Sequence, residues 1–359
     1  MLLVNVLVAD DSAFMRKMIS GMLTSDPVIT VIGTARNGED TLRCIKKYRP
    51  DVVTLDVEMP VMDGLEALKR IMEECPVPVI LVSSVTAEGA DETLKAMEYG
   101  AFDFIPKPSG AISLDIEAIK TDLINKVKHA ASTGAARSAN PREAVAAHTP
   151  GLENAESKTR DFHTNVHLKT LIAIGVSTGG PKALQKVLPA LPKELNAPVL
   201  IVQHMPEGFT KSLSSRLNKL SGIRVKEAEN GELLQPGTAY IAPGGRHLRV
   251  RKIGASLACE LGEGPPVHGH RPSVDVLFES LALLTDHKVI AAILTGMGSD
   301  GTKGLKTLKH SVKTLAITES EKTAVVFGMP RAAAESGVAD IVADIDQTAA
   351  LIERFSRRG

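Results

Sequence analysis

The sequence contains no tryptophan, and aromatic residues make up only 3% of its 359 residues. Proteins that hold single-stranded nucleic acid stack the bases on aromatic side chains, so this composition disfavours that class. The chain also lacks an excess of either charge, because 42 lysines and arginines balance 42 aspartates and glutamates. A general nucleic-acid binder normally carries a basic excess. We therefore expect no nucleic-acid partner.

Cysteine is scarce as well, with three residues that are far apart and form no C-x-x-C pair: Cys44, Cys75 and Cys259. Such usage gives no disulfide framework or zinc site and fits a reducing compartment. No apolar run approaches the 18 residues of a membrane span, so we expect no membrane insertion. The apolar start, MLLVNVLVAD, lacks the basic flank of a signal peptide and indicates a strand. We expect a cytoplasmic monomer.

The balanced charge hides an uneven distribution along the chain. Residues 1–130 carry 14 basic and 20 acidic side chains, whereas residues 167–359 carry 24 basic and 18 acidic ones. Residues 131–166 are rich in Ala, Ser, Thr, Asn and Pro without an apolar period, which is typical of a linker. A helical stretch near Arg142–Ala147 stays open. Since a domain takes roughly 150 residues, we predict two domains, 1–130 and 167–359, joined by the linker.

Both predicted domains alternate strand-like runs with segments of helical period, which predicts βαβ units and doubly wound parallel sheets in an α/β fold. In the first domain the expected strands are Val6–Ala9, Val28–Ile32, Val52–Leu55, Val77–Val82 and Phe102–Ile105, and the expected helices are Ser12–Leu23, Gly64–Glu74 and Ala90–Tyr99, with Ser12 as an N-cap. In the second domain the strands are Thr170–Ile174, Pro198–Val202, Ala239–Ala242, Val289–Leu294 and Thr314–Thr318, and the helices are Pro181–Leu188, Thr302–His310 and Gln347–Phe355.

Acidic residues follow two strands of the first domain: Asp10 and Asp11 end the first strand, and Asp56 ends the third. In the strand order 2-1-3-4-5 these ends meet at the point where strand order reverses. Three carboxylates repel one another unless a hard cation is bound, and oxygen ligands of this kind suit Mg²⁺. Lys107, after the fifth strand, and Ser83, at the end of the fourth, are expected to reach the same site.

These residues, together with DVEMPVMDG at residues 56–64, resemble the receiver domain of response regulators, a flavodoxin-like fold. The resemblance implies that Asp56 accepts a phosphoryl group from a histidine kinase. Mg²⁺, held by Asp10, Asp11 and Asp56, and the amine of Lys107 would neutralise the phosphoryl oxygens. Ser83 would then hydrogen-bond the phosphoryl group and draw its loop inward, with Tyr99 as a further candidate for rearranged contacts.

A possible nucleophile opens the second domain. The segment Gly175–Gly179 reads G-x-S-x-G between a strand and a helix, which is the pattern of a nucleophile elbow around Ser177. A nucleophilic serine needs a base and an orienting acid. His204 and Asp300 both follow strands, so we expect all three at the carboxyl edge of one sheet. Their order along the chain, Ser, His, Asp, differs from that of α/β-hydrolases, which predicts a different, Rossmann-like scaffold.

A rival interpretation rests on Gly296–Gly301, a literal G-x-G-x-x-G between a strand and a helix. Glu319 ends the next strand, where a dinucleotide-binding fold places its ribose-binding acid. This hypothesis of a receiver-fused dinucleotide-binding enzyme leaves Ser177 and His204 without a role. A non-catalytic phosphate sink or docking regulator is the other alternative, and it has no need of the three residues on one edge.

Six segments of the second domain, GVSTGGP, VQHMPEGFT, YIAPGG, HRPSVDVLF, LTGMGSDG and VVFGMPRAA, resemble the catalytic domain of chemotaxis protein-glutamate methylesterases. The resemblance implies that Ser177 is the nucleophile, His204 the general base and Asp300 the orienting carboxylate. The expected substrates are glutamate methyl esters of methyl-accepting chemoreceptors, with deamidation of receptor glutamines as a second activity. The backbone N–H groups of Met297 and Thr178 are the expected oxyanion donors. We expect no cofactor in this domain.

Two further patterns have plain interpretations. The spacing His268-x-His270 occurs in metal sites, but no other Cys or His cluster accompanies it, so we expect a polar loop near the active site. The basic residues of the predicted helix Thr302–His310 are expected to form a solvated face, with docking of an acidic partner as the alternative.

Overall fold

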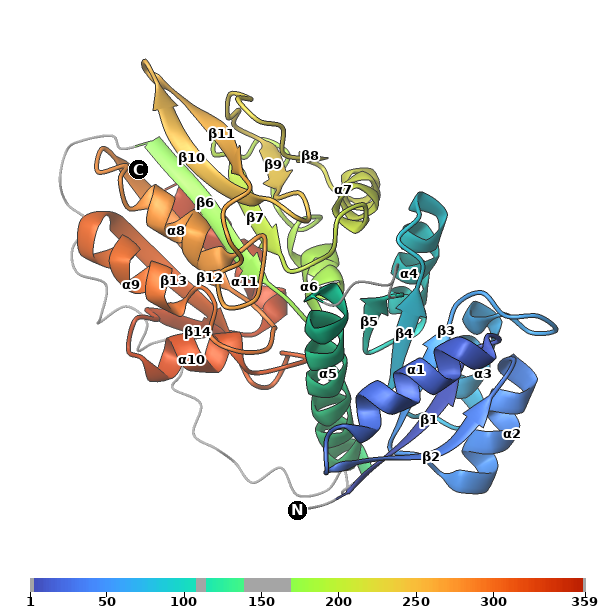
Figure 1. Ribbon diagram of the computed structural model, residues 1–359. Helices are drawn as coiled ribbons and strands as arrows, with labels where there is room; N and C mark the ends of the chain where they lie inside the picture. The colour runs from blue at the N-terminus through green and yellow to red at the C-terminus, as the bar shows by residue number, and fades with distance from the viewer. Residues whose placement is uncertain (1–2, 108–113, 139–168, 358–359) are drawn as a thin grey trace. The chain divides into compact units, whose positions relative to one another are not determined.

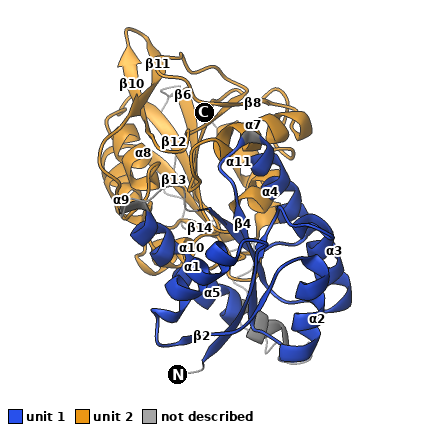
Figure 2. Ribbon diagram, turned by 45° about the vertical axis from the view of Figure 1, so that its right-hand side comes forward, with its two compact units in different colours: residues 1–147 blue, residues 148–359 orange. Residues whose placement is uncertain are grey.

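The computed structural model describes residues 3–107, 114–138 and 169–357 (Figure 1). The chain divides into two units, residues 1–147 and residues 148–359 (Figure 2). Figure 1 shows helices against both faces of the main sheet of each unit. This arrangement confirms the predicted fold class, two doubly wound α/β domains.

The first unit is built on a five-stranded parallel sheet in the order β2-β1-β3-β4-β5, as predicted. Its central strands are buried on both faces, which is why they read as nearly continuous apolar runs. The strands are β1 (Val4–Ala9), β2 (Ile29–Ala35), β3 (Val52–Asp56), β4 (Val79–Ser83) and β5 (Asp103–Pro106). The helices are α1 (Ala13–Thr24), α2 (Gly38–Tyr48), α3 (Gly64–Glu74), α4 (Ala87–Tyr99) and α5 (Leu114–Ser138).

Short polar side chains begin four of these helices. Ser12, Asn37, Asp63 and Thr86 each accept a hydrogen bond from a backbone N–H of the first turn, which satisfies one of the donors that a helix start leaves unpaired. The predicted N-cap Ser12 is thereby confirmed, with its Oγ 3.4 Å from the amide nitrogen of Met15. Helix α2 was not among the predicted elements, although Asn37 and its strongly amphipathic sequence are signals for it.

Helix α5 continues to Ser138, beyond the predicted domain end at residue 130 and into the segment expected to be linker. Leu123, Val127 and Ala130 are fully buried at helical spacing and anchor the helix on the sheet. The alanines that follow are strong helix formers, so the helix persists after its apolar face ends. The expected linker remainder and the stretch Arg142–Ala147 lie outside the described residues.

The second unit contains a seven-stranded parallel sheet in the order β14-β13-β12-β6-β7-β9-β8. Its strands are β6 (Lys169–Val176), β7 (Val199–Gln203), β8 (Arg224–Glu227), β9 (Thr238–Ile241), β12 (His287–Ile293), β13 (Lys313–Glu319) and β14 (Ile341–Ala343). Its helices are α6 (Gly180–Val187), α7 (Phe209–Leu220), α8 (Val274–Leu281), α9 (Thr302–Ser311), α10 (Met329–Glu335) and α11 (Ile345–Ser356).

An antiparallel hairpin, β10 (His247–Ile253) with β11 (Ser256–Gly262), packs against α8 and was not predicted. The sequence of β10 alternates apolar and charged residues because only one face of the hairpin is covered. Helix α8 was also not predicted. Most of its residues are buried, so its apolar run shows no helical period by which it could be recognised.

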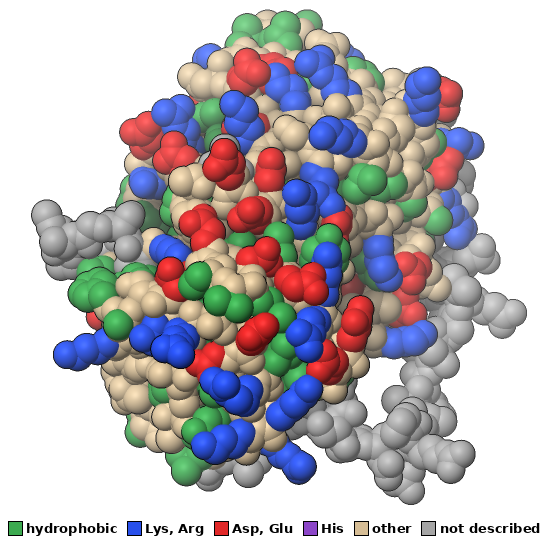
Figure 3. All heavy atoms as spheres, turned by 90° about the vertical axis from the view of Figure 1, so that its right-hand side faces the viewer, with side chains coloured by type: hydrophobic (Ala, Val, Ile, Leu, Met, Phe, Trp, Pro, Cys, Tyr) green, Lys and Arg blue, Asp and Glu red, His purple; other side chains and the backbone are tan. Residues whose placement is uncertain are grey.

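Charged side chains of both signs are interspersed on the face of the molecule that Figure 3 presents. Among the described residues, no helix combines the length and apolar character that crossing a membrane requires. The apolar core of the second unit includes Val274, Phe278, Ile293 and Leu305, which lie on elements that carry the loops of the candidate site.

Candidate functional site

The loops that follow β6, β7 and β12 carry Ser177, His204 and Asp300, and these strands are neighbours in the order β12-β6-β7. The three residues therefore stand at one carboxyl edge, where parallel sheets place their ligands. Backbone hydrogen bonds join the loops: the Ser177 N–H donates to the Thr295 carbonyl at 3.0 Å, and the His204 N–H donates to the Val176 carbonyl at 3.0 Å.

The segment around Ser177 forms a tight turn that only glycine permits. Gly179 has φ = 79°, in the left-handed region, and α6 begins directly after it with Pro181 in its first turn. A side chain at Gly180 would place its Cβ 2.0 Å from Gln203 Oε1. The Nε2 of Gln203 donates to the carbonyls of both Ser177 and His204 at 3.0 Å. Gln203 thus ties the serine and histidine segments together.

His204 and Asp300 form a buried pair, with Nε2 of the imidazole 2.8 Å from Oδ2 of the carboxylate. Burial alone would raise the pKa of Asp300, but the hydrogen bond and charge of His204, together with backbone N–H donors, hold it below its ordinary value. Asp300 is therefore a fixed anion that orients the imidazole. Its oxygens also accept from four other groups: Ser273 Oγ and the backbone N–H groups of Val274, Asp275 and Gly301.

The other nitrogen of His204, Nδ1, is buried and has no hydrogen-bond partner among the described residues. Because Nε2 faces the carboxylate, Nδ1 is the nitrogen that remains for proton transfer with a nucleophile. The ring of His270 stacks on the ring of His204, with centroids 3.9 Å apart and planes inclined by 11°. The sequence motif HRPSVDVLF contained His270 and Ser273, but nothing in its pattern assigned them these contacts.

The glycine-rich loop Gly296–Gly301 lies against the serine segment. A Cβ at Gly296 would stand 2.7 Å from the Cβ of Ser177, and one at Gly328 would stand 2.7 Å from the carbonyl oxygen of Gly296. Close approach of backbone to backbone is therefore what these glycines provide. Met297 follows Gly296 in this loop, and Thr178 is buried directly after Ser177. Both expected oxyanion donors accordingly belong to backbone segments beside the serine.

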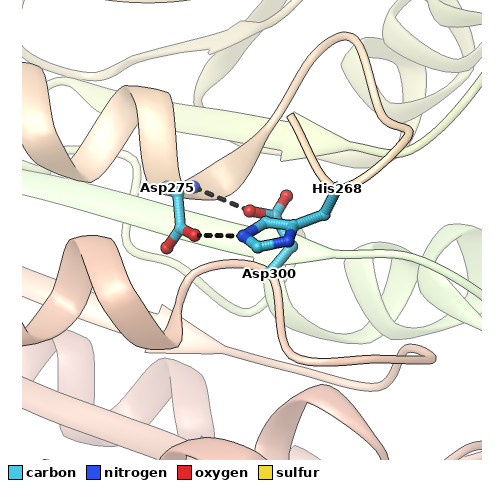
Figure 4. A group of neighbouring side chains, drawn as sticks. All are labelled: His268, Asp275 and Asp300. Atoms are coloured by element: carbon cyan, nitrogen blue, oxygen red, sulfur yellow. Dashed lines mark hydrogen bonds and ion pairs between the residues drawn. The ribbon is translucent and has the colours of Figure 1, made fainter. Parts of the chain in front are cut away.

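His268 and His270 turn to different partners, so they do not form a shared metal site. Figure 4 shows the imidazole of His268 pointing at Asp275, whose own N–H group is directed at Asp300. The His268 Nε2 lies 3.1 Å from Asp275 Oδ2, and ligand atoms of the three residues lie within 4.8 Å of one another. Since the oxygens of Asp300 already accept hydrogen bonds from other groups, we interpret these residues as a hydrogen-bonded cluster.

The structure contradicts the dinucleotide hypothesis, because its ribose-binding acid, Glu319, is already engaged. Glu319 is 1% exposed and accepts hydrogen bonds from the Thr295 N–H at 2.8 Å and from Thr323 Oγ1 at 2.9 Å. No ribose hydroxyl can reach it. Asp300, in the middle of the glycine motif, orients His204. The motif was misleading because a loop that approaches a serine needs the same backbone freedom as one that approaches a pyrophosphate.

The basic face predicted on α9 is largely neutralised by neighbouring acids. Lys303 pairs with Glu279 at 2.9 Å, and Lys309 pairs with Asp340 at 2.6 Å. Two of its three lysines therefore face partners within the second unit, which supports the solvated-face interpretation over docking of an acidic partner.

In the first unit, Asp10, Asp11 and Asp56 converge at the carboxyl ends of β1 and β3, with ligand atoms within 4.8 Å of one another. Burial and the charge of Asp10 raise the pKa of Asp56 to about 6, although Lys107 opposes this from 2.8 Å. Burial also raises the pKa of Asp10, whose Oδ2 is buried without a hydrogen-bond partner among the residues described. A hard divalent cation would satisfy this oxygen, so the donor set fits Mg²⁺.

Ser83, expected at the same site, is buried, and its Oγ donates to the Gly89 carbonyl in the first turn of α4 at 3.1 Å. In this structure the Ser83 hydroxyl therefore contacts α4 and makes no hydrogen bond to Asp56. Tyr99, at the end of α4, is 39% exposed, with Lys69 Nζ 4.6 Å from its ring centroid. A cavity of about 400 Å³ opens beside Asp11, lined by Glu58, Met59 and other residues that follow β3.

A second cavity, of about 430 Å³, lies in the second unit, at the amino ends of the strands of the seven-stranded sheet. It is lined by Thr170, Pro198 and His287, which lie at or next to the starts of strands. Ligands of parallel sheets bind at the carboxyl ends of strands. This cavity therefore lies away from the edge where Ser177 and His204 stand.

Comparisons with known proteins identify the families of both units. The chain matches the family model for CheB methylesterase over residues 172–352 and the model for the response regulator receiver domain over residues 6–118. A protein-glutamate methylesterase/protein-glutamine glutaminase of Geobacillus kaustophilus is 56% identical over 349 residues, 97% of each chain. One of Halalkalibacterium halodurans is 54% identical over 99% of each chain. The crystal structure of the Thermotoga maritima CheB methylesterase catalytic domain is 42% identical, with a TM-score of 0.50, and covers 52% of this chain and 97% of that one.

Proposed function

Because the chain belongs to the CheB methylesterase family and carries a response regulator receiver domain, we propose that it is a phosphorylation-regulated serine esterase of chemotactic adaptation. Its substrates are glutamate methyl esters on methyl-accepting chemoreceptors. The observation that carries the proposal is the His204–Asp300 pair, which leaves Nδ1 of the imidazole buried and without a hydrogen-bond partner among the described residues. A binding module has no need of such a pair.

The reaction begins when Ser177 Oγ attacks the ester carbonyl while His204 Nδ1 takes the hydroxyl proton. The C–O bond to the methoxy group then breaks, and His204 returns the proton to the departing methanol. A water molecule attacks the acyl-enzyme with His204 again as base, which releases the glutamate carboxylate and restores Ser177. Asp300 holds the imidazole and stabilises its cation. The N–H groups of Met297 and Thr178 are the proposed donors to the oxyanion.

The same residues support hydrolysis of a glutamine side-chain amide. The leaving group is then ammonia, to which His204 delivers the proton, and the acyl-enzyme is the same glutamyl ester of Ser177. The relatives from Geobacillus and Halalkalibacterium bear names with both activities. We extend this second activity to the present chain.

The first unit regulates the esterase through Asp56, which accepts a phosphoryl group from a chemotaxis histidine kinase in the cytoplasm. When bound by Asp10, Asp11 and Asp56, Mg²⁺ would supply charge neutralisation at the phosphoryl oxygens. Lys107, 2.8 Å from both oxygens of Asp56, adds a second cation there. Ser83 would leave the Gly89 carbonyl to bind the phosphoryl group, which changes the contacts of α4.

The test measures methanol released from methylated receptor membranes, with and without a small-molecule phosphoryl donor and Mg²⁺. Ser177→Ala should lower turnover by about 10³-fold or more, since removing a member of such a triad removes the covalent route. Asp56→Ala should keep the basal rate and lose the stimulation by the donor.

Ser214→Ala is the matched control for the serine, because Ser214 is also buried and, within the described part of the chain, its Oγ hydrogen-bonds only the Lys211 carbonyl of its own helix. We expect it to retain turnover within about twofold, in line with a change remote from the reacting groups. Substantial turnover in Ser177→Ala would refute the catalytic assignment, and full stimulation of Asp56→Ala would refute the regulatory one.

A further inference from the structure

Glu319, at the end of β13, is a buried carboxylate to which the proposed reaction gives no part. Its Oε2 accepts a hydrogen bond from the Thr295 N–H, in the loop after the neighbouring strand β12. We propose that Glu319 is a positioning residue for the esterase reaction, which fixes the places of Ser177 and of the Gly296–Met297 loop through Thr295. This inference rests on the proposed function.

Thr295 contacts both sides of the nucleophile. Its carbonyl accepts the N–H of Ser177 at 3.0 Å, and its hydroxyl donates to the carbonyl of Thr178 at 2.9 Å. The same hydroxyl accepts the N–H of Val326 at 3.0 Å. With Glu319 on its own N–H, every polar group of Thr295 is engaged. A shift of Thr295 therefore moves the backbone on either side of Ser177.

The loop that begins at Gly296 depends on the same anchor. The Gly296 N–H donates to the Val326 carbonyl at 3.0 Å, and its own carbonyl accepts the N–H groups of Gly328 at 3.1 Å and Met329 at 2.8 Å. Met297, the proposed oxyanion donor, comes next. Glu319 thus holds the residue from which both the nucleophile segment and the oxyanion segment are positioned, and an oxyanion donor must be in place before charge develops.

The chemistry of the side chain explains why a carboxylate occupies this position. In its ionised form the carboxylate only accepts hydrogen bonds, so its two oxygens serve the Thr295 N–H and the Thr323 hydroxyl at the same time. Both donors are uncharged, and burial raises the pKa of Glu319, so its ionised form is less stable there than in water. A buried acid with this penalty is expected where function requires it. For positioning, the length of the Glu319 side chain, which lets its oxygen accept the Thr295 N–H, therefore matters more than its charge.

The experiment compares three variants of the full chain in the methanol-release assay, with the phosphoryl donor saturating so that regulation is constant. Glu319→Gln keeps an acceptor at the same reach and should retain kcat within about fivefold, the scale of one neutral hydrogen bond. Glu319→Asp keeps the charge but shortens the side chain. It and Glu319→Ala should lower kcat about 10- to 100-fold, the cost of a displacement near 1 Å, with KM changed less than twofold.

Thr323→Val is the matched control, because it removes the partner of the other Glu319 oxygen and leaves the Thr295 contact; its kcat should stay within about threefold of the wild type. If Glu319→Ala does not fold, the Gln and Asp variants still decide, since each keeps a polar group in the site. An active Glu319→Asp protein together with an inactive Glu319→Gln protein would overturn the inference. A loss of kcat that merely equals the unfolded fraction seen in thermal melts would overturn it as well.

Ser177→Ala separates this inference from the proposed function. If Ser177→Ala retains turnover, the proposed function fails, whereas an inactive Ser177→Ala with unaffected Glu319 variants refutes this inference alone.

Discussion

At the scale of single residues, the site is organised around one buried carboxylate, Asp300. Asp300 is 2% exposed and is surrounded by donors from the start of α8 as well as by His204. These N–H and O–H groups replace the water that an exposed carboxylate would bind, so Asp300 stays ionised and in one orientation. The orientation of the histidine therefore depends, through Asp300, on Ser273 and its neighbours.

Ser273→Ala tests this dependence. The Ser273 Oγ donates to Asp300 Oδ1 at 2.8 Å, and a hydrogen bond to a charged group contributes about 1.5–3 kcal/mol. Part of that energy acts on the imidazolium of the transition state, so kcat/KM should fall about 10-fold, equivalent to about 1.4 kcal/mol. The steady-state rate of methanol release measures it.

Ser280→Ala is the control for this change. Ser280 is a buried serine of the same helix region, and its hydroxyl bonds the Leu277 carbonyl and the Val250 N–H, remote from Asp300. Both variants should lose stability, but only Ser273→Ala should lose activity. Equal loss of kcat/KM in the two variants would contradict the role given to Ser273.

Residues that follow strands were predictable, because a parallel sheet brings the carboxyl ends of its strands to one edge. That rule placed Ser177, His204 and Asp300 on neighbouring loops and Asp10 and Asp56 on another edge. The roles of Gln203, Thr295 and Glu319 were not predictable, since hydrogen bonds between loops that are far apart in sequence leave no periodic signal. The position of Glu319 at the end of a strand indicated a place on the carboxyl edge, but the glycine motif before it pointed to dinucleotide binding.

At the scale of elements, helices α8 and α9 carry the donors and the loop that surround Asp300, and they pack through Gly304 in the first turn of α9. The Gly304 N–H donates to Asp275 Oδ1 at 2.6 Å. A Cβ at this glycine would lie 2.7 Å from the carbonyl oxygen of Asp275 and 2.9 Å from the Cβ of Phe278. The two helices can approach this closely only because the residue has no side chain.

Gly304→Ala should therefore separate α8 from α9 and reduce the free energy of unfolding of the second unit by about 1–3 kcal/mol, the usual effect of overpacking. Gly21→Ala is the matched control in a helix of the first unit: nothing lies within 4 Å of its Cβ position, so alanine should stabilise that unit by about 0.5–1 kcal/mol. Calorimetric unfolding of the two variants measures both effects. A Gly304→Ala protein as stable as the wild type would show that the helix contact is not tight.

Elements were predictable where their sequence has a period or a cap. The runs of β3 and β12 and the amphipathic α3 appear in the structure close to their predicted bounds. Helix α8 and the hairpin β10–β11 were missed because full burial removes the period from the former and the latter interrupts the βαβ alternation. Helix α5 was not predicted, and the predicted domain end at residue 130 falls inside it, because alanine occurs in both helices and linkers and composition alone does not separate them.

At the scale of the whole molecule, the balanced charge divides into a net −6 over residues 1–130 and a net +6 over residues 167–359. Opposite net charges attract, and the attraction between exposed charges weakens with salt, since the Debye length falls from about 30 Å at 0.01 M to about 10 Å at 0.1 M. If this attraction brings the unphosphorylated receiver domain to the esterase and restrains it, added salt should release the restraint.

We therefore predict that the basal methanol release of the unphosphorylated full chain rises between about 10 and 100 mM monovalent salt, over the range where screening develops. Residues 148–359 alone provide the control, because salt effects on substrate binding or on the esterase itself act on both proteins equally. The deciding quantity is the rate of the full chain divided by the rate of residues 148–359 alone. A ratio that rises with salt supports electrostatic restraint by the receiver domain, and a flat ratio contradicts it.

Phosphorylation adds negative charge at Asp56, which by attraction alone would tighten the restraint. Activation by phosphorylation must therefore act through changed contacts around α4, such as those of Ser83 and Tyr99.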